Sequence, residues 1–183
     1  MNQADSLAFS PIGKAIRHLA LGFFDGLHLG HQRIILGANP SYPPETTAVF
    51  TFRDHPLSVL HPEKHPALIT GLPHKLRLLE RWGISLTIAL PFDSARSQQE
   101  PAAFLEELAQ AFPNLQTLSV GPNWRFGKNR TGDVTLLSDW CSKRSISLDN
   151  PETVLYQEER ISSSRIRTSI QAGNLTDASA MLG

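Results

Sequence analysis

Cysteine is nearly absent from this sequence, in which Cys141 is the single thiol among 183 residues. One thiol cannot form a disulfide within the chain, so a small domain held together by disulfides is excluded. Cys141 stands in the stretch VTLLSDWCSKR, where no histidine lies near it in sequence. We therefore predict a structural thiol on a helix rather than a catalytic nucleophile.

An excess of charge of either sign is also absent, because 17 Lys and Arg residues balance 17 Asp and Glu residues. No overall field favours nucleic acid or an anionic membrane, so any anion site must be local. A secretory signal is not apparent either, since Arg17 and His18 interrupt the only apolar run near the start. We expect a cytoplasmic chain without a nucleic-acid or membrane partner. The sequence does not indicate protein partners.

Short apolar runs alternate with helical patterns along the chain. Strands are predicted at residues 16–23, 47–52, 86–90, 115–120 and 146–148, and helices at 31–38, 74–83, 101–112, 134–144, 162–173 and 174–183. This alternation predicts an α/β fold, a Rossmann-like doubly wound, mostly parallel sheet with helices on both faces. The length fits one domain over residues 1–183. Residues 53–71, with three His-Pro steps, form a long loop of the kind that often carries function.

The stretch GFFDGLHLGH places two histidines after the first predicted strand. Asp25 and Gly26 predict a sharp turn, and Gly30 leaves room for a ligand near the start of the next helix. The N–H groups and positive dipole end of a helix N-terminus suit a phosphate, to which His28 and His31 can add N–H donors. A catalytic zinc site normally has three protein ligands, which this spacing does not offer. The alternative is a pair of capping or surface histidines.

Two further basic segments follow later strands. GPNWRFGKNRTGD, residues 121–133, contains three cations between glycines and aromatics, and RISSSRIR, residues 160–167, places arginines around three serines. Either segment alone is more typical of a solvated surface. Because the carboxyl ends of parallel strands share one edge of the sheet, three such segments together predict a single polyphosphate site.

These segments carry a family resemblance. GFFDGLHLGH matches the G-x-F-D-G-x-H-x-G-H pattern of the HxGH nucleotidyltransferases, and VFTFRDHP, GPNWRFGKNRTGD and RISSSRIR follow in the order of bacterial FAD synthetases. The chain resembles their adenylyltransferase module from about residue 16 to residue 183. The resemblance implies that ATP with Mg²⁺ reacts with FMN to give FAD and pyrophosphate.

The resemblance also implies roles for individual residues. The residues implied in catalysis are His28, His31, Asn123 and Arg167, with Asn123 orienting phosphates and magnesium. Those implied in ATP binding are Gly22, Phe23, Phe24, Asp25, Gly30, Arg160, Ser163 and Ser164. Those implied at the flavin are Asp54, Pro56 and Phe126. No protein metal ligand is implied, and Mg²⁺ is expected to arrive with ATP.

The sequence departs from the family at several positions. Phe23 stands where family members often have Asn, and Asp54 stands where they usually have Pro. Trp124 occupies a position that is commonly Phe, and Ser164 occupies one that is commonly Thr. A carboxylate at Asp54 repels a flavin phosphate unless its side chain turns away. Family members continue after the equivalent of residues 181–183 into a riboflavin kinase module, so we expect a single nucleotidyltransferase domain without a kinase domain.

The sequence therefore predicts an FMN adenylyltransferase. Two alternatives stay open: the same fold acting on another acceptor, such as pantetheine phosphate or nicotinamide mononucleotide, or a nucleotide- or flavin-binding module without catalysis. Metal binding through His55, His61, His65 and His74 is disfavoured because their spacing lacks a ligand pattern. The charge states of His28 and His31 are left open by the sequence.

Overall fold

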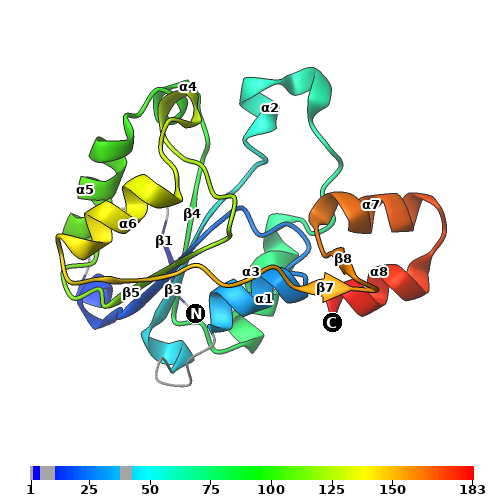
Figure 1. Cartoon of the computed structure of the whole chain (residues 1–183), viewed down its shortest axis with the longest axis horizontal. Coiled ribbons are helices and arrows are strands. Elements are labelled where there is room, and N and C mark those ends of the chain that lie inside the picture. Colours follow the sequence, from blue (N-terminus) through cyan, green and yellow to red (C-terminus); the bar gives the residue numbers. More distant parts are fainter. Residues whose placement is uncertain (1, 5–10, 38–42) are drawn as a thin grey trace.

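The computed structural model describes residues 2–4, 11–37 and 43–183. Its centre is a parallel sheet of six strands in the order β1-β4-β3-β2-β5-β6 (Figure 1). The strands are β1 (Asn2–Ala4), β2 (His18–Leu21), β3 (Thr47–Phe52), β4 (Leu86–Leu90), β5 (Thr117–Val120) and β6 (Ser147–Asp149). A separate antiparallel pair joins β7 (Leu155–Tyr156) and β8 (Glu159–Arg160).

Helices connect consecutive strands. The α-helices are α1 (Leu29–Leu36), α2 (Leu57–Leu60), α3 (Leu72–Arg81), α4 (Ser94–Ser97), α5 (Pro101–Ala111), α6 (Val134–Ser142), α7 (Ser163–Gln171) and α8 (Leu175–Leu182). Short 3-10 helices occur at η1 (Pro11–Ala15), η2 (Pro44–Thr46), η3 (Pro62–Lys64) and η4 (Lys128–Arg130). Across the described residues, no helix has both the length and the apolar character needed to cross a bilayer.

Helices cover both faces of the sheet, which is why its central strands, β2 to β5, are buried along nearly their whole length. Leu19 and Leu21 of β2 pack into one core with residues of α5 and α6, whereas Ala20 packs into another with residues of α1 and α3. This alternation follows the period of two along a strand. The predicted doubly wound α/β sheet is thereby confirmed.

The strand order reverses beside β2. From β2 the chain winds through α1 and α3 to β3 and β4 on one side, and α5 then carries it to β5 on the other side. Open parallel sheets bind ligands beyond the carboxyl ends of the strands at such a point. The α2 and α4 segments project beyond this edge, and α7 and α8 pack together beside it (Figure 1).

The predicted elements match the structure except at their ends, in two short helices and in two short pairings. The helix α2 lies within residues 53–71, which were predicted as a long loop, and α4 was not predicted either. The first predicted strand extends over residues 16–23, but β2 ends at Leu21 because Gly22 begins the turn toward α1. The helix predicted at 31–38 begins earlier in the structure, at Leu29, and ends at Leu36. The last residue of the predicted range, residue 38, lies outside the described part of the chain. Strand β1, which pairs with β4, and the β7–β8 pair were not predicted. Strands of two or three residues are too short to show a hydrophobic period.

Candidate active site

The N-terminus of α1 places the two histidines in contact. His28 is the N-cap residue, and its Nδ1 accepts a hydrogen bond from the backbone N–H of His31 at 3.3 Å. The two rings stack with their centroids 3.5 Å apart and their planes 19° from parallel. A Cβ atom on Gly30 would lie 3.2 Å from the His28 ring, so the glycine leaves room for this ring. One predicted alternative, a capping histidine, is therefore correct for His28 without excluding a ligand contact.

Both imidazoles are neutral near pH 7. Burial, followed by the charge of Arg160, lowers the pKa of His28 to about 4, whereas Asp25 acts in the opposite direction. Burial also lowers the pKa of His31 well below its ordinary value, followed by the effects of His28, Lys75 and Arg160. The structure thus answers the question of charge state that the sequence left open.

A neutral imidazole donates from one nitrogen only. Since Nδ1 of His28 accepts the His31 N–H, the remaining proton of His28 is on Nε2. The Nδ1 atom of His31 is buried and has no hydrogen-bond partner among the described residues. The pair can therefore offer N–H donors without adding a full positive charge.

The lowered pKa of His28 predicts that acid destabilises the fold. As pH falls below 6.5, the unfolded chain takes up the proton first, so the free energy of unfolding decreases between pH 6.5 and about 4. At pH 5, neutral His28 accounts for a loss of about 2 kcal/mol relative to pH 7.5. Urea unfolding at both pH values measures the difference. His18, whose pKa burial also lowers to about 4, adds to the same trend.

The matched control for this prediction is His28→Asn, which retains a capping side chain without a group that titrates in this range. In this variant the loss between pH 7.5 and pH 5 should be smaller by about 2 kcal/mol. An equal loss in both proteins would show that His28 does not resist protonation.

Asp25 joins three segments that are distant in sequence. Its carboxylate is 3% exposed and accepts hydrogen bonds from the backbone N–H groups of Ile69 and Thr70 at 2.9–3.1 Å. It also forms an ion pair with Arg167 of α7, which donates a second bond to the Ala67 carbonyl at 2.7 Å. The carboxylate is thus satisfied within the protein, and it fixes both α7 and residues 67–70 against the β2–α1 turn.

The start of α7 is fixed to the same turn. Ser162 is the N-cap and accepts from the Arg165 N–H, while Ser163 donates to the carbonyl oxygen of Asp25 at 2.9 Å. Between this helix and α1 lies a cavity of about 180 Å³. Its lining includes His28, His31, Arg160 and Ser163, together with Ile34 and residues 121–122 and 151–154. The cavity wall therefore combines hydrogen-bond donors and one cation, Arg160, with apolar side chains and one carboxylate, Glu152.

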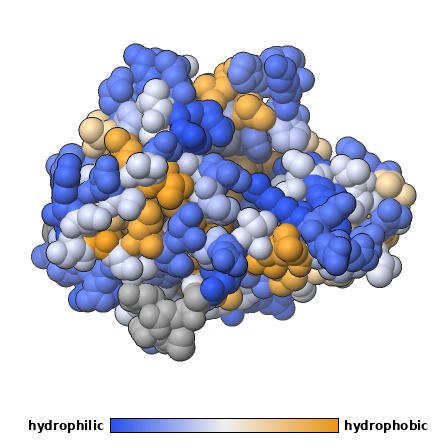
Figure 2. Space-filling model, viewed as in Figure 1, coloured by the Kyte–Doolittle hydropathy of each residue, from blue (hydrophilic) through white to orange (hydrophobic). Residues whose placement is uncertain are grey.

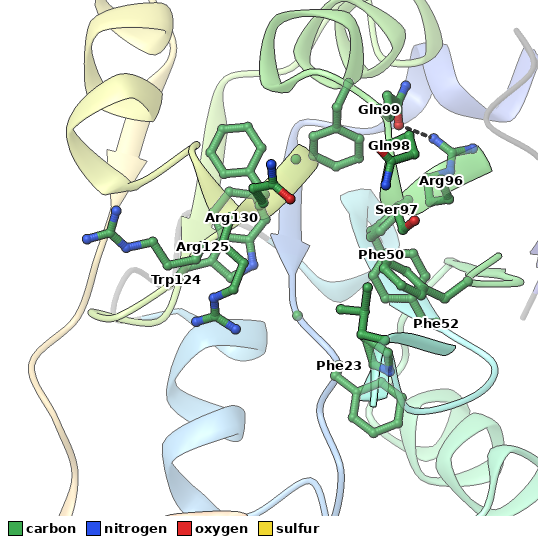
Figure 3. A pocket seen from close by; sticks show the side chains of 18 of the residues that line it. Phe23, Phe50, Phe52, Arg96, Ser97, Gln98, Gln99, Trp124, Arg125 and Arg130 are labelled. Atoms are coloured by element: carbon green, nitrogen blue, oxygen red, sulfur yellow. Dashed lines mark hydrogen bonds between the residues drawn. The ribbon is translucent and has the colours of Figure 1, made fainter. Parts of the chain in front are cut away.

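A larger cavity of about 590 Å³ lies on the other side of the β2–α1 turn. In the space-filling view, apolar side chains gather in a hollow between two hydrophilic projections (Figure 2), which are the α2 and α4 segments of Figure 1. Trp124, Arg125 and Arg130 face residues 96–99 across the cavity, with Phe23 below them (Figure 3). Residues 121–123 connect the two cavities, since Gly121 lines the smaller one and Asn123 the larger one.

Aromatic rings form much of the wall of the larger cavity. Trp124 stacks on Phe126 with centroids 4.4 Å apart, and Phe104 packs against both rings. Phe126 forms a bridge to Gly132, where a Cβ atom would come within 2.8 Å of the ring. The glycine therefore allows the basic loop to fold back over Phe126, and the wall suits a flat aromatic ligand.

The structure brings most of the predicted site residues to the two cavities. The larger one is lined by Gly22, Phe23, Pro56, Asn123 and Phe126, and the smaller one by His28, Gly30, His31, Arg160 and Ser163.

Four of the other predicted residues line neither of the two cavities. Phe24 is buried beneath His31, Asp25 and Arg167 pair with each other, and Ser164 is exposed on α7. Asp54 is exposed and does not line the larger cavity. A flavin contact by Asp54 therefore stays a prediction.

Sequence reasoning missed several residues at the site. Lys75 is 1% exposed beneath the β2–α1 turn, and residues 96–99 line the larger cavity, where Arg96 is held by Gln99 and Glu107. The signal for Lys75 was present, because it falls between Leu72 and Leu79 on the apolar stripe of a helix, where a charged residue is unusual. Residues 96–99 show no comparable pattern.

Cys141 is buried in α6, and burial raises its pKa to about 11. A thiol with so high a pKa is a poor nucleophile at neutral pH. The predicted structural role agrees with this environment. Among the described residues, no group of three or more His, Cys, Asp or Glu side chains is arranged to hold a metal ion.

A parallel α/β sheet with a His-x-Gly-His helix start at its switch point agrees with the resemblance of the sequence to the HxGH nucleotidyltransferases. Comparison with known families gives a more specific result, because residues 14–165 match the family model described as FAD synthetase. The chain belongs to the FAD synthetase family.

Several relatives of known name are similar to this chain. It is 34% identical over 169 residues to the bifunctional riboflavin kinase/FMN adenylyltransferase of Bacillus subtilis, covering 90% of this chain and 52% of that protein. It is 32% identical over 167 residues to a FAD synthetase of Listeria monocytogenes, covering 90% and 68%. The bifunctional enzyme of Escherichia coli is 29% identical, with 90% and 53% covered. The chain thus spans about half the length of the bifunctional relatives.

A solved structure also resembles this fold. The crystal structure described as a macrolide-efflux protein from Streptococcus pneumoniae superimposes with a TM-score of 0.77 at 27% identity. The match covers 92% of this chain and 64% of the other. It supports the same arrangement of sheet and helices.

Proposed function

We propose that this chain is an FMN adenylyltransferase, which transfers AMP from ATP to FMN and releases pyrophosphate. The observation that carries the proposal is the pair of cavities on the two sides of the β2–α1 turn, joined at residues 121–123. One is lined by Arg160 and by the N-termini of α1 and α7, which suit a triphosphate, and the other has an aromatic wall, which suits a flavin. The names of the relatives, FAD synthetase and FMN adenylyltransferase, support the same reaction.

The reaction needs no general base. The second pKa of a phosphate monoester is near 6, so the FMN phosphate is mostly a dianion at neutral pH. One of its oxygens forms a bond to the α-phosphorus of ATP, and the bond from that phosphorus to the β-bridging oxygen breaks. The electron pair leaves with pyrophosphate, and no proton is transferred. The protein must place two mutually repelling anions in line and stabilise the charge that develops.

The smaller cavity supplies groups for the triphosphate. The N–H groups at the start of α1 and the Nε2–H of His28 are donors, while Arg160 provides positive charge. Ser163 begins α7, whose N-terminus faces the same cavity. We propose that Mg²⁺ enters as part of the ATP substrate, bound by phosphate oxygens, with Asn123 near the transferred phosphate. Arg167 is proposed to act at the pyrophosphate side, where its pairing with Asp25 fixes its position.

The larger cavity favours a flavin over the other acceptors. A volume of about 590 Å³ lies in the range of sites for ligands of cofactor size. The stacked Trp124 and Phe126 rings suit a broad aromatic ring system better than the narrow chain of pantetheine phosphate. The exposed position of Asp54 leaves its carboxylate free to point away from the flavin phosphate. A cytoplasmic location, where such substrates occur, is part of the proposal.

The acceptor test uses FMN, pantetheine phosphate and nicotinamide mononucleotide, each with ATP and Mg²⁺. Chromatography and a pyrophosphate assay are expected to show product with FMN alone. Conversion of another mononucleotide in preference to FMN would identify a different acceptor. Binding of FMN and ATP without any pyrophosphate would indicate a module without catalysis.

Replacement of Phe126 by leucine tests the flavin wall. The Phe126→Leu variant keeps an apolar side chain but loses the ring contact, so KM for FMN should rise about threefold to tenfold, equivalent to roughly 0.7–1.4 kcal/mol. KM for ATP should stay near the wild-type value, because Phe126 lines only the larger cavity of the two. Phe112→Leu, a core aromatic away from both cavities, is the control. Equal changes in both variants would contradict a flavin contact.

A further inference from the structure

Lys75 is a buried cation that the proposed reaction does not yet use. It belongs to α3 and is 1% exposed, and it lines neither of the two cavities. Its Nζ donates to the carbonyl oxygen of Phe23 at 2.5 Å and to Oγ1 of Thr51 at 3.3 Å. Burying a lysine is unfavourable unless its charge is paired or hydrogen-bonded. The first contact is with the turn between β2 and α1, and the second is with a residue of β3 that donates to the same Phe23 carbonyl.

The turn that Lys75 contacts has an unfavourable backbone. Phe24 and Leu27 have φ values of +54° and +47°, in the left-handed region that residues with bulky side chains rarely occupy. Such a conformation persists only where surrounding contacts enforce it. The carbonyl of Phe23, immediately before Phe24, accepts from both Lys75 and the Thr51 hydroxyl, the latter at 2.8 Å. The two donors fix the peptide at which the left-handed segment begins.

The same turn separates the two cavities. Phe23 lines the larger cavity, and the turn ends at His28, which lines the smaller one. The ammonium of Lys75 also lies 4.2 Å from the centroid of the Phe23 ring, whose edge contacts His55. The positive charge of Lys75 contributes to the lowered pKa of His31, which lines the smaller cavity. It also contributes to the lowered pKa of His55, which contacts Phe23. Lys75 therefore touches the junction of both sites without contacting either ligand cavity.

We propose that Lys75 is a positioning residue for adenylyl transfer, which holds the Phe23 carbonyl and thereby sets the distance between the His28 donor and the acceptor bound against Phe23. This inference rests on the proposed function. Misplacement of reacting groups by about 1 Å can cost about 100-fold in rate. A loosened turn should consequently reduce kcat while leaving the walls of both cavities intact.

The test replaces Lys75 by methionine, which keeps most of the volume but removes the charge and the donor. The Phe23 carbonyl keeps the Thr51 hydroxyl as a donor in this variant, so no buried acceptor is left unsatisfied and the melting temperature should change little. The kcat for FAD formation should fall at least about tenfold, while KM for ATP and for FMN changes by less than about threefold. Lys143→Met, at an exposed position after α6, is the matched control.

Two further measurements distinguish a positioning role of Lys75 from a general loss of structure in the variant. Amide hydrogen exchange at residues 24–28 should accelerate in Lys75→Met but not in Lys143→Met, with exchange in β2 and β5 unchanged. Thr51→Val, which removes the other donor to the same carbonyl, should combine with Lys75→Met in a non-additive way in kcat.

A kcat within about twofold of wild type, unchanged exchange in the turn, or additive effects of the two substitutions would each overturn the proposal. If the wild-type chain makes no FAD, the proposed function fails instead. The exchange measurement still decides in that case whether Lys75 fixes the turn.

Discussion

The His28→Asn variant is expected to retain the stability of the wild-type chain at pH 7.5 but to lose about 100-fold in kcat, or about 2.7 kcal/mol of transition-state stabilisation. Asparagine is a good N-cap residue, so the hydrogen bond to the His31 N–H is kept. The donor lost is the imidazole Nε2–H, which we propose to stabilise the charge that develops on the phosphates. Steady-state kinetics and urea unfolding measure the two effects separately.

The comparison with other variants makes the result specific. His28→Ala should lose the same activity and in addition about 1 kcal/mol of stability, because the cap is removed. His31→Ala should also reduce kcat, since its ring stacks on that of His28. His74→Ala, an exposed histidine on α3, is the control and should have wild-type activity. Normal turnover in His28→Asn would assign His28 a capping role only.

The Asp25→Ala variant is expected to lose about 3 kcal/mol in its free energy of unfolding. The substitution removes the acceptor of two backbone N–H groups and leaves Arg167 unpaired, although its side chain is only 16% exposed. Breaking one partner of a buried ion pair is costly for this reason. Asp139→Ala, at an exposed position on α6, should change stability by less than about 0.5 kcal/mol. Urea unfolding provides both values.

A double-mutant cycle connects this prediction to function. Asp25→Ala and Arg167→Ala together should destabilise the chain by less than the sum of the single substitutions, because the second removes a charge already unpaired. Arg167→Lys should keep the ion pair but lower kcat more than it raises KM for ATP, since lysine lacks the planar fork of arginine. Additive stabilities would show that the pair is not coupled. An unchanged kcat in Arg167→Lys would remove Arg167 from the reaction.

Much of the site was predictable because its parts lie at the ends of strands. The run LALGFF predicts a buried strand, and a helix that begins near His31 then needs an anion or a cap at its N-terminus. The same reasoning places the loop at residues 121–133 beside it, since parallel strands end at one edge. The family resemblance assigned these segments to ATP and FMN, and the family itself is confirmed by the match over residues 14–165.

The sequence by itself determined the alternation of the longer strands and helices, the parallel sheet and the histidine pair at its edge, because these depend on local periodicity and on spacing within one segment. Only the tertiary structure decided the charge state of the histidines, since their pKa values depend on burial and on Arg160 and Lys75 from other elements. It also decided that Asp25 pairs with Arg167, 142 residues away. Contacts of this range arise from the packing of α3 and α7 against the turn, which no local pattern in the sequence encodes.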